Sequence, residues 1–149
     1  MTTAMPEFDV RVGRWAELGT DARAIREAVF VQEQRIPIEL EWDEADAHCL
    51  HAVAFDAGGR AIATGRLLEH VPGVAKIGRM AVLREARGLG AGRVVLDALM
   101  QGARGLGYQE ALLHAQLSAK GFYLRAGFEA RGAEFDEAGI RHVEMIKAL

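Results

Sequence analysis

The chain has 149 residues, 50% of them hydrophobic, and a formal net charge of −3 at pH 7. This length and apolar content predict one globular domain over residues 1–149, and the slight negative charge argues against a nucleic-acid partner. No segment has the apolar core of a signal peptide or the ~20 apolar residues of a membrane span, and Cys49 is the only cysteine. We therefore expect a soluble cytoplasmic protein without a membrane partner.

Hydrophobic periodicity predicts strands and helices along the whole chain. In chain order these are a strand at 8–15, a helix at 21–34, strands at 48–56, 61–70 and 74–83, a helix at 91–106, a strand at 110–116, a short helix between Ser118 and Gly127, and strands at 128–132 and 141–148. Because one helix connects strand 74–83 to strand 110–116, we expect these two strands to be parallel, with a right-handed crossover. The predicted fold class is therefore α/β with a mixed sheet.

The junction between strand 74–83 and helix 91–106 is the most informative segment. It contains Arg87 and glycines at 88, 90 and 92. Glycines allow the backbone to approach a ligand, and the start of a helix adds unpaired N–H donors, so this junction predicts a site for a phosphate group. A dinucleotide-binding G-x-G-x-x-G would need glycine where Arg93 stands, and a nucleotide P-loop would need Gly-Lys followed by Ser or Thr.

The spacing R-x-x-G-x-G, at Arg87, Gly90 and Gly92, resembles the acyl-CoA diphosphate loop of the GNAT N-acetyltransferase superfamily. The string F-Y-x-x-x-G-F over 122–128 is similar to the fourth helix and following strand of that superfamily. Val-Phe-Val-Gln-Glu-Gln at 29–34 and Glu-Trp-Asp at 41–43 resemble the ElaA-like subgroup. The resemblance covers nearly the whole chain.

This resemblance implies a GNAT fold, which is a single mixed, mostly antiparallel sheet of six to seven strands with helices on both faces and a splayed parallel central pair. It also implies acetyl-CoA as cosubstrate, with the pantetheine arm between strands 74–83 and 110–116, and no metal. The backbones of Met80 and Val82 would pair with pantetheine and polarise the thioester carbonyl. The implied cofactor-binding residues are Met80, Ala81, Val82, Arg87, Gly88, Leu89, Gly90, Ala91 and Gly92.

The implied reaction is direct attack of an acceptor amine on the acetyl thioester in a ternary complex. The amine must lose a proton, the oxyanion needs a donor, and the leaving thiolate benefits from a proton. Tyr123 is expected to be the acid, and a tyrosine that only packs is the alternative. The candidates for the general base are Glu33, Glu44, His48, His51 and His114. We take Glu44 and His114 as the predicted catalytic candidates. A base that acts through water is also compatible with the superfamily.

Two clusters of charged residues indicate which charges the ligands carry. Basic residues around the glycine loop suit a CoA polyphosphate, with ordinary surface arginines as the alternative for Arg84 and Arg93; they are Lys76, Arg79, Arg84, Arg87 and Arg93. Acidic residues lie where GNAT proteins build the acceptor wall; they are Glu39, Glu41, Asp43, Glu44 and Asp46. This run favours an amine or basic acceptor, and a solvated acidic loop explains it equally well. The expected partner is a small-molecule amine or amino-acid-like acceptor, or a protein or peptide amine.

Three further alternatives are kept or set aside. The segment His48-Cys49-Leu50-His51 is not expected to bind metal, because strand alternation turns His48 away from Cys49 and His51. A non-catalytic acyl-CoA binding module and an acyltransferase of the acyl-homoserine-lactone synthase type remain as rival functions, although the loop and the short chain argue against the second. The oligomeric state, including a homodimer, is left open.

Overall fold

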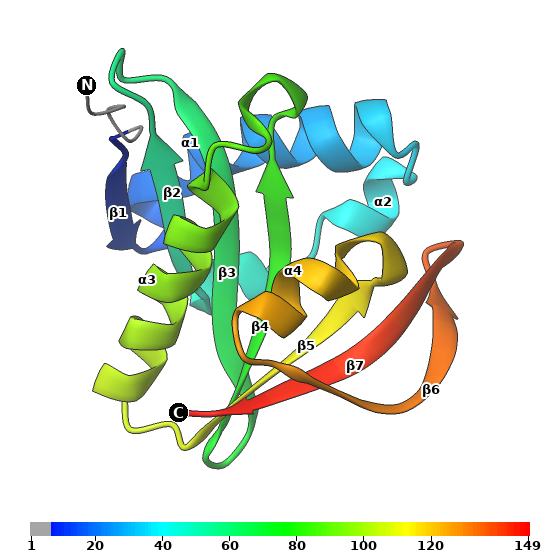
Figure 1. Cartoon of the computed structure of the whole chain (residues 1–149). Helices are drawn as coiled ribbons and strands as arrows, with labels where there is room; N and C mark the ends of the chain where they lie inside the picture. The colour runs from blue at the N-terminus through cyan, green and yellow to red at the C-terminus, as the bar shows by residue number, and fades with distance from the viewer. Residues whose placement is uncertain (1–6) are drawn as a thin grey trace, which may run out of the picture.

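The computed structural model describes residues 7–149 and arranges them around a seven-stranded sheet with the order β1-β2-β3-β4-β5-β7-β6 (Figure 1). The strands are β1 Asp9–Gly13, β2 Leu50–Phe55, β3 Ala61–Val71, β4 Val74–Val82, β5 Glu110–Gln116, β6 Glu129–Glu137 and β7 Ile140–Ala148. The α-helices are α1 Trp15–Arg26, α2 Ile38–Glu41, α3 Ala91–Gly105 and α4 Lys120–Arg125, and a π-helical segment, η1 Glu27–Glu33, continues α1. Short 3-10 turns are η2 Glu44–His48, η3 Arg84–Ala86 and η4 Leu117–Ala119.

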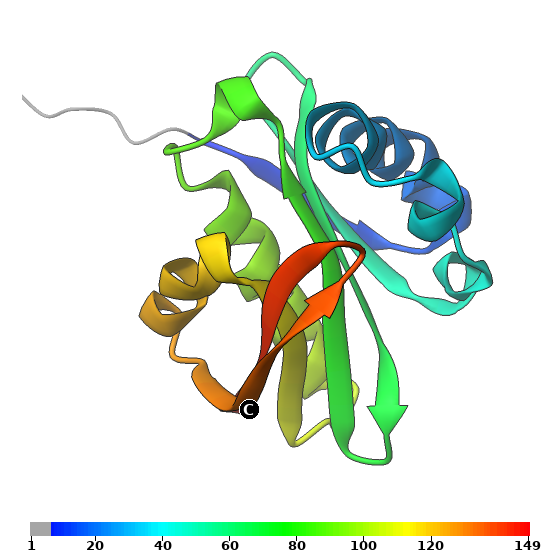
Figure 2. The ribbon, with the colours of Figure 1, turned by 90° about the vertical axis from the view of Figure 1, so that its right-hand side faces the viewer.

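Helices cover both faces of the sheet. Figure 2 shows α3 and α4 on one face and α1 and α2 on the other. Val95 and Leu99 of α3 and Ala22 and Ile25 of α1 are almost completely buried against the strands. All neighbouring strands are antiparallel except β4 and β5, which are parallel. The predicted mixed, mostly antiparallel sheet with helices on both faces is confirmed.

The first helix starts earlier than the periodicity predicted, at Trp15 rather than at residue 21, and the preceding strand ends at Gly13. A carboxylate oxygen of Glu17 accepts a hydrogen bond from the Arg14 backbone N–H (3.1 Å) and so caps the helix. Leu18 is buried on the same helix. This cap was missed because its acceptor lies inside the helix rather than before it.

The last hairpin is longer than predicted, because β6 runs to Glu137 rather than to residue 132. Nearly every β6 residue is exposed, so no alternation of apolar and polar residues marks this edge strand. The turn uses Ala138 and Gly139, both with positive φ (52° and 75°). The short helix predicted between Ser118 and Gly127 is α4; Ser118 lies in the 3-10 turn before it, and Gly127 follows it with a left-handed backbone, φ 93°.

The central strands β4 and β5 pair only at their first residues, from Val74 opposite Glu110 to Ile77 opposite Leu113. Beyond this point they diverge, as Figure 1 shows. The expected splayed parallel pair is therefore present, and beyond Ile77 one edge of β4 has no strand partner among residues 7–149. Within residues 7–149, no helix has the length and apolar character needed to cross a bilayer.

Candidate functional site

The glycine loop after β4 forms one wall of a pocket of about 480 Å³. Its lining residues are Val82, Ala86, Arg87, Gly88, Gly90, Ala91, Gly92, Arg93, Phe122 and Arg125. Gly88 and Gly90 have φ of 81° and 92°, a left-handed conformation that residues with a Cβ rarely adopt. The backbone N–H groups at the start of α3 have no partner within the helix, so the pocket offers the donors that a phosphate needs. Leu89 is half exposed and does not line the pocket.

The free edge of β4 borders this pocket. Leu83 N–H donates to the Ile62 carbonyl (2.9 Å), so Leu83 is hydrogen-bonded to β3. Along an antiparallel ladder, such residues alternate with residues whose backbone groups point away from the partner strand. The N–H and C=O groups of Val82 are therefore directed away from β3, towards the gap that opens beyond Ile77. An extended ligand can pair with such an edge as an added strand does.

A bulge in β4 lies just before this edge. Arg79 and Met80 both face Gly65 of β3, and Arg79 has a positive φ of 51°. The Met80 side chain lies over Gly65, because a Cβ there would come within 2.4 Å of the Met80 sulfur. Ala81 follows the bulge, pairs with Thr64 of β3 and is buried. The bulge turns the Arg79 side chain to the face of α2, away from the phosphate loop, so the expected grouping of Arg79 with that loop is wrong.

Arg87 is held by a carboxylate rather than left free in the pocket. Its Nη1 and Nη2 donate to the two carboxylate oxygens of Glu33 on η1 (2.6 and 2.7 Å), and its Nε donates to the Val82 carbonyl (3.1 Å). Arg84 lies 3.4 Å from the same carboxylate. The hydrogen bonds from Arg87 keep the pKa of Glu33 below its usual value. Glu33 is thus an internal anion at the phosphate loop.

Arg125 and Phe122 bring α4 into the pocket, and sequence reasoning missed both. An ideal Cβ on Gly92 would lie 3.1 Å from a methyl carbon of Val82 and 3.4 Å from the Phe122 ring, so strand end, helix start and α4 meet there. Neither residue belongs to the loop motif. Both residues lie on the same short helix as Tyr123, and this position in the sequence could have indicated that they face the pocket.

Tyr123 is almost completely buried beside Phe122 and packs edge-on against that ring and the Phe128 ring, at 5.0 and 5.9 Å between centroids. Burial raises the pKa of its hydroxyl well above the usual value, so the group keeps its proton at neutral pH. Its hydroxyl makes no hydrogen bond to any residue that the structure describes. The hydroxyl is therefore protonated and not committed to another described residue, while its raised pKa makes it a weaker acid than a free tyrosine.

His114 lies on the other face of the sheet from Tyr123. On β5 it shares a face with Gln116, whose side-chain amide exchanges hydrogen bonds of 2.9 and 3.3 Å with Gln34 just after η1. The two ring nitrogens of His114 lie 3.3 Å from a carboxylate oxygen of Glu137 and 3.5 Å from one of Glu144. His114 is therefore held between two acids.

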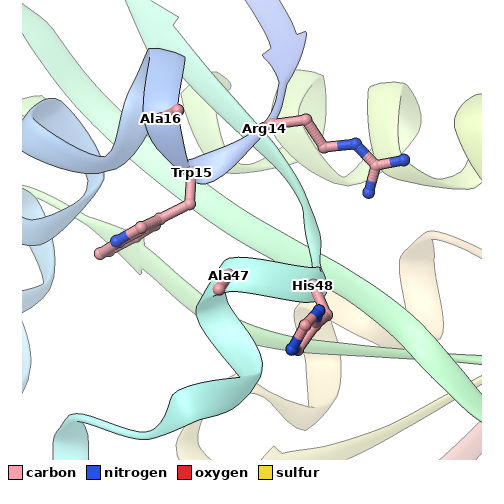
Figure 3. A pocket seen from close by; sticks show the side chains of 5 residues that line it. All are labelled: Arg14, Trp15, Ala16, Ala47 and His48. Carbon is pink, nitrogen blue, oxygen red and sulfur yellow. The ribbon is translucent and has the colours of Figure 1, made fainter.

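None of the remaining residues considered for a base, His48, His51 and Glu44, lines the glycine-loop pocket. His51 is buried and its Nε2 lies 2.9 Å from the Asp46 carbonyl oxygen, and His48 borders a second pocket of about 410 Å³ (Figure 3). That pocket is lined by Arg14, Trp15, Ala16, Ala47 and His48, none of which lines the first pocket. Glu44 is exposed and has no ion-pair partner within residues 7–149.

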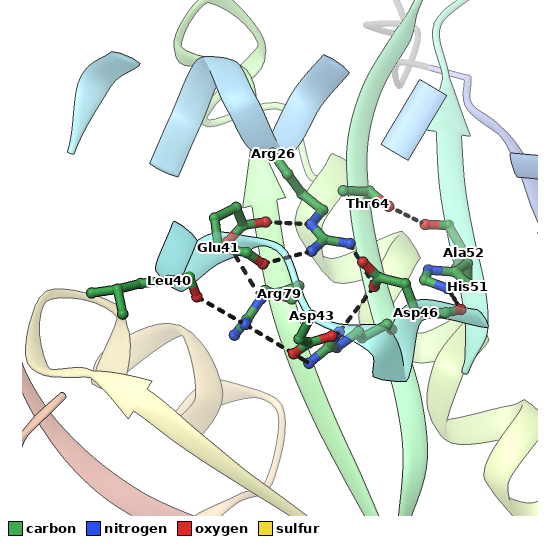
Figure 4. A network of polar contacts seen from close by, with 10 residues as sticks. Arg26, Leu40, Glu41, Asp43, Asp46, His51, Ala52, Thr64 and Arg79 are labelled. Carbon is green, nitrogen blue, oxygen red and sulfur yellow. Dashed lines mark hydrogen bonds and ion pairs between the residues drawn. The ribbon is translucent and has the colours of Figure 1, made fainter. Parts of the chain in front are cut away.

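Three of the five acids in the acidic run are paired with arginines and are not free in solvent. Figure 4 shows Glu41, Asp43 and Asp46 drawn together with arginines from α1 and β4. Arg26, only 1% exposed, meets Glu41 at 2.5 Å and Asp46 at 2.8 Å. The solvated-loop interpretation is thus wrong for Glu41 and Asp46, which are buried.

The third acid of this network is also neutralised. Arg66 of β3 holds Asp43 through two hydrogen bonds of 2.7 and 2.8 Å and reaches Asp46 at 2.9 Å. Arg79 lies 3.2 Å from Asp43. Three carboxylates therefore face three arginines, and these acids do not present free negative charge to an acceptor. Of the run, only Glu39 and Glu44 are both exposed and outside the ion pairs found within residues 7–149.

Comparison with known proteins agrees with this geometry. The family described as "Acetyltransferase (GNAT) domain" matches residues 24–149. The chain is 37% identical, over 85% of its length and 90% of the relative's, to a Bacillus subtilis protein called "Uncharacterized N-acetyltransferase YjcF". A crystal structure of an acyl-CoA N-acyltransferase from Pseudomonas aeruginosa is similar at 30% identity and a TM-score of 0.82, covering 95% of this chain and all of that one. Escherichia coli ElaA shares the fold, with a TM-score of 0.82 at 23% identity over 95% of this chain and 99% of that one.

Proposed function

Because the chain belongs to the GNAT acetyltransferase family, we propose that it transfers the acetyl group of acetyl-CoA to an amine by direct attack in a ternary complex. The acceptor would be a small-molecule or amino-acid-like amine, or an amine of a protein or peptide. The observation that carries the proposal is the edge of β4 at Val82, which has no strand partner among the described residues and ends at a glycine-lined pocket. An acyl-CoA needs both features, an edge for pantetheine and a donor-rich pocket for phosphates.

In this proposal the diphosphate binds the N–H groups of the loop from Gly88 to Gly92, and pantetheine pairs with the backbone of Val82. The thioester then lies at the bulge, where the Met80 N–H polarises its carbonyl and stabilises the tetrahedral oxyanion. Support comes from the positive φ of the loop glycines and from the direction of the Val82 backbone groups. Leu89 and Ala91 would contribute their backbone, and Ala81, which pairs with Thr64 of β3, would hold the strand edge in place.

Two side chains complete the proposed chemistry from opposite faces of the sheet. Tyr123, whose buried hydroxyl keeps its proton at neutral pH, would protonate the leaving thiolate. His114 would take the proton of the acceptor amine, with Glu137 and Glu144 stabilising the imidazolium that forms. Glu44, exposed at the start of η2, is the second choice for the base.

Within this proposal residues 1–149 act as one catalytic domain in the cytoplasm, where a single cysteine stays reduced.

The test is an acetyl-transfer assay with a panel of amines and amino acids, read by the free thiol of the released CoA. Burial raises the pKa of Cys49 to about 11, so the protein's own thiol adds little background. Release of CoA that depends on one class of amine supports the proposal. Binding of acetyl-CoA without amine-dependent release across the panel would favour the non-catalytic binding module instead.

The base is tested with the best acceptor from that panel. We expect His114→Asn to lower kcat/KM for the acceptor by roughly 10²-fold or more, with the KM for acetyl-CoA unchanged. His70→Asn, at an exposed position at the end of β3, is the matched control. Equal activity of the two variants would remove His114 from the mechanism.

A further inference from the structure

Three arginines line the pocket at the glycine loop, but their charges are not equally available. Arg87 is held bidentately by Glu33, and Arg93 pairs with Asp97 one turn along α3 at 3.0 Å. Within residues 7–149, no carboxylate lies within ion-pair distance of Arg125. Among the described residues that line the pocket, Arg125 is therefore the one cation without a carboxylate partner.

Arg125 approaches the pocket from α4, the wall opposite the glycine loop. An ideal Cβ on Gly121 would lie 3.3 Å from Nη1 of Arg125, so the guanidinium lies back along the helix over a residue without a side chain. Phe122, which also lines the pocket, lies beside the start of α3, because an ideal Cβ on Gly92 would come within 3.4 Å of its ring. The pocket thus has a backbone donor wall on one side and a free guanidinium on the other.

Coenzyme A carries two chemically different phosphate groups. The diphosphate is a diester whose charge is spread along the chain, whereas the 3′-phosphate of the ribose is a monoester that carries close to two negative charges at neutral pH. Backbone N–H groups at a helix start suit the diphosphate. A free guanidinium suits the monoester, because its planar fork can donate two parallel hydrogen bonds to the oxygens of one phosphate.

We propose that Arg125 recognises the 3′-phosphate of coenzyme A and makes the enzyme select CoA over its 3′-dephospho form. The inference rests on the proposed function, since it assumes that the pocket holds the nucleotide end of an acyl-CoA. It adds a specificity-determining residue outside the loop motif. Arg93, already paired with Asp97, contributes less to this discrimination.

The experiment measures dissociation constants of CoA and 3′-dephospho-CoA by calorimetry at low ionic strength, which needs no knowledge of the acceptor. We expect the wild-type chain to bind CoA roughly tenfold more tightly than dephospho-CoA, a difference within the range of charge-assisted hydrogen bonds. In Arg125→Gln this ratio falls to near one, because CoA binding weakens while dephospho-CoA binding does not change. Arg125→Lys, which keeps the charge and loses the fork, recovers part of the ratio.

Two control variants test whether the loss of any positive charge, rather than the charge at Arg125, lowers the preference for CoA. Arg93→Gln removes a paired cation from the same pocket, and Arg104→Gln removes one from the far end of α3, outside the pocket. Both should keep most of the preference for CoA. Equal weakening of both ligands in Arg125→Gln, or an unchanged ratio, would overturn the assignment. A wild-type chain that binds neither ligand would overturn the proposed function itself.

Discussion

The carboxylate of Glu33 and the guanidinium of Arg87 face each other through two hydrogen bonds of 2.7 and 2.6 Å, although 54 residues separate them in the chain. This pair joins η1, on one face of the sheet, to the phosphate loop at the end of β4. The arginine of the loop motif is thus already matched by an anion of the protein. A phosphate of the ligand that contacts Arg87 must compete with Glu33.

Glu33→Gln should therefore lower the KM for acetyl-CoA, by roughly two- to fivefold at low salt. The change removes the carboxylate that competes for Arg87 and one negative charge beside the phosphates, and salt screens such an effect. Initial rates at two ionic strengths measure it. Glu85→Gln removes an equal charge from the neighbouring turn, where Glu85 pairs with Arg60, and should shift KM less. A higher KM in Glu33→Gln would mean that Glu33 orients Arg87 for the ligand.

Gly92→Ala should weaken acetyl-CoA binding by roughly tenfold and leave the fold intact. The added methyl group would crowd Val82 and Phe122, at 3.1 and 3.4 Å, and narrow the approach to the loop backbone. Gly105→Ala, at the open far end of the same helix, is the control and should leave binding unchanged. Melting temperatures of both variants check folding. If Gly92→Ala bound acetyl-CoA as tightly as Gly105→Ala, the proposed position of the diphosphate at the loop would be wrong.

Tyr123→Phe separates chemistry from packing, because it removes one oxygen and keeps the buried ring. If the hydroxyl protonates the thiolate, turnover should fall by roughly 10² to 10⁴, with acetyl-CoA affinity nearly unchanged. Stability should change by less than about 1 kcal/mol, since no hydrogen bond to the described residues is lost. Tyr108→Phe, at the only other tyrosine, serves as the control. A near-normal kcat would mean that the thiolate leaves unassisted or takes its proton from water.

Glu41→Gln should destabilise the fold by about 3–5 kcal/mol, because it takes the charged partner from an arginine that is only 1% exposed. The Arg26 side chain lies near the rings of Trp15 and Trp42, at 5.5 and 5.4 Å from their centroids, and cannot reach water without unpacking them. Urea unfolding measures the loss. Glu39→Gln, at an exposed acid of the same run, should change stability by less than about 0.5 kcal/mol. If Glu41→Gln and Glu39→Gln had similar free energies of unfolding, the ion pair between Glu41 and Arg26 would not stabilise the fold.

The same network makes stability depend on pH at the acid end. Hydrogen bonds from Arg66 lower the pKa of Asp43 from 3.8 to about 2, and those from Arg26 and Arg66 outweigh burial and lower the pKa of Asp46 as well. A lowered pKa stabilises the folded state above the unfolded value, so the free energy of unfolding should fall as pH drops from about 4 towards 2. Asp43 is 37% exposed, so we expect its share to be about 1 kcal/mol.

Unfolding experiments between pH 5 and 2 test this dependence. Asp43→Asn should flatten the curve over that window, because the titrating group is removed. Asp97→Asn, which breaks an exposed pair on α3, should leave the slope unchanged. A wild-type curve that is flat below pH 4 would contradict the lowered pKa values.

The sequence alone was sufficient for the features that depend on neighbours in the chain. The glycines at 88 and 90 need a left-handed backbone wherever the loop lies, and the loop motif occupies six consecutive positions from Arg87. The parallel pairing of β4 and β5 follows from the single helix between them. Gly127 ends α4 for the same local reason.

Only the tertiary structure decided which charges meet. The sequence could not pair Glu33 with Arg87, assign the acidic run to Arg26 and Arg66, or bring Arg125 to the phosphate loop. Backbone preferences act between adjacent residues and are therefore encoded locally, whereas an ion pair depends on the distance between side chains from separate segments. That distance is fixed only when the sheet and its covering helices have packed.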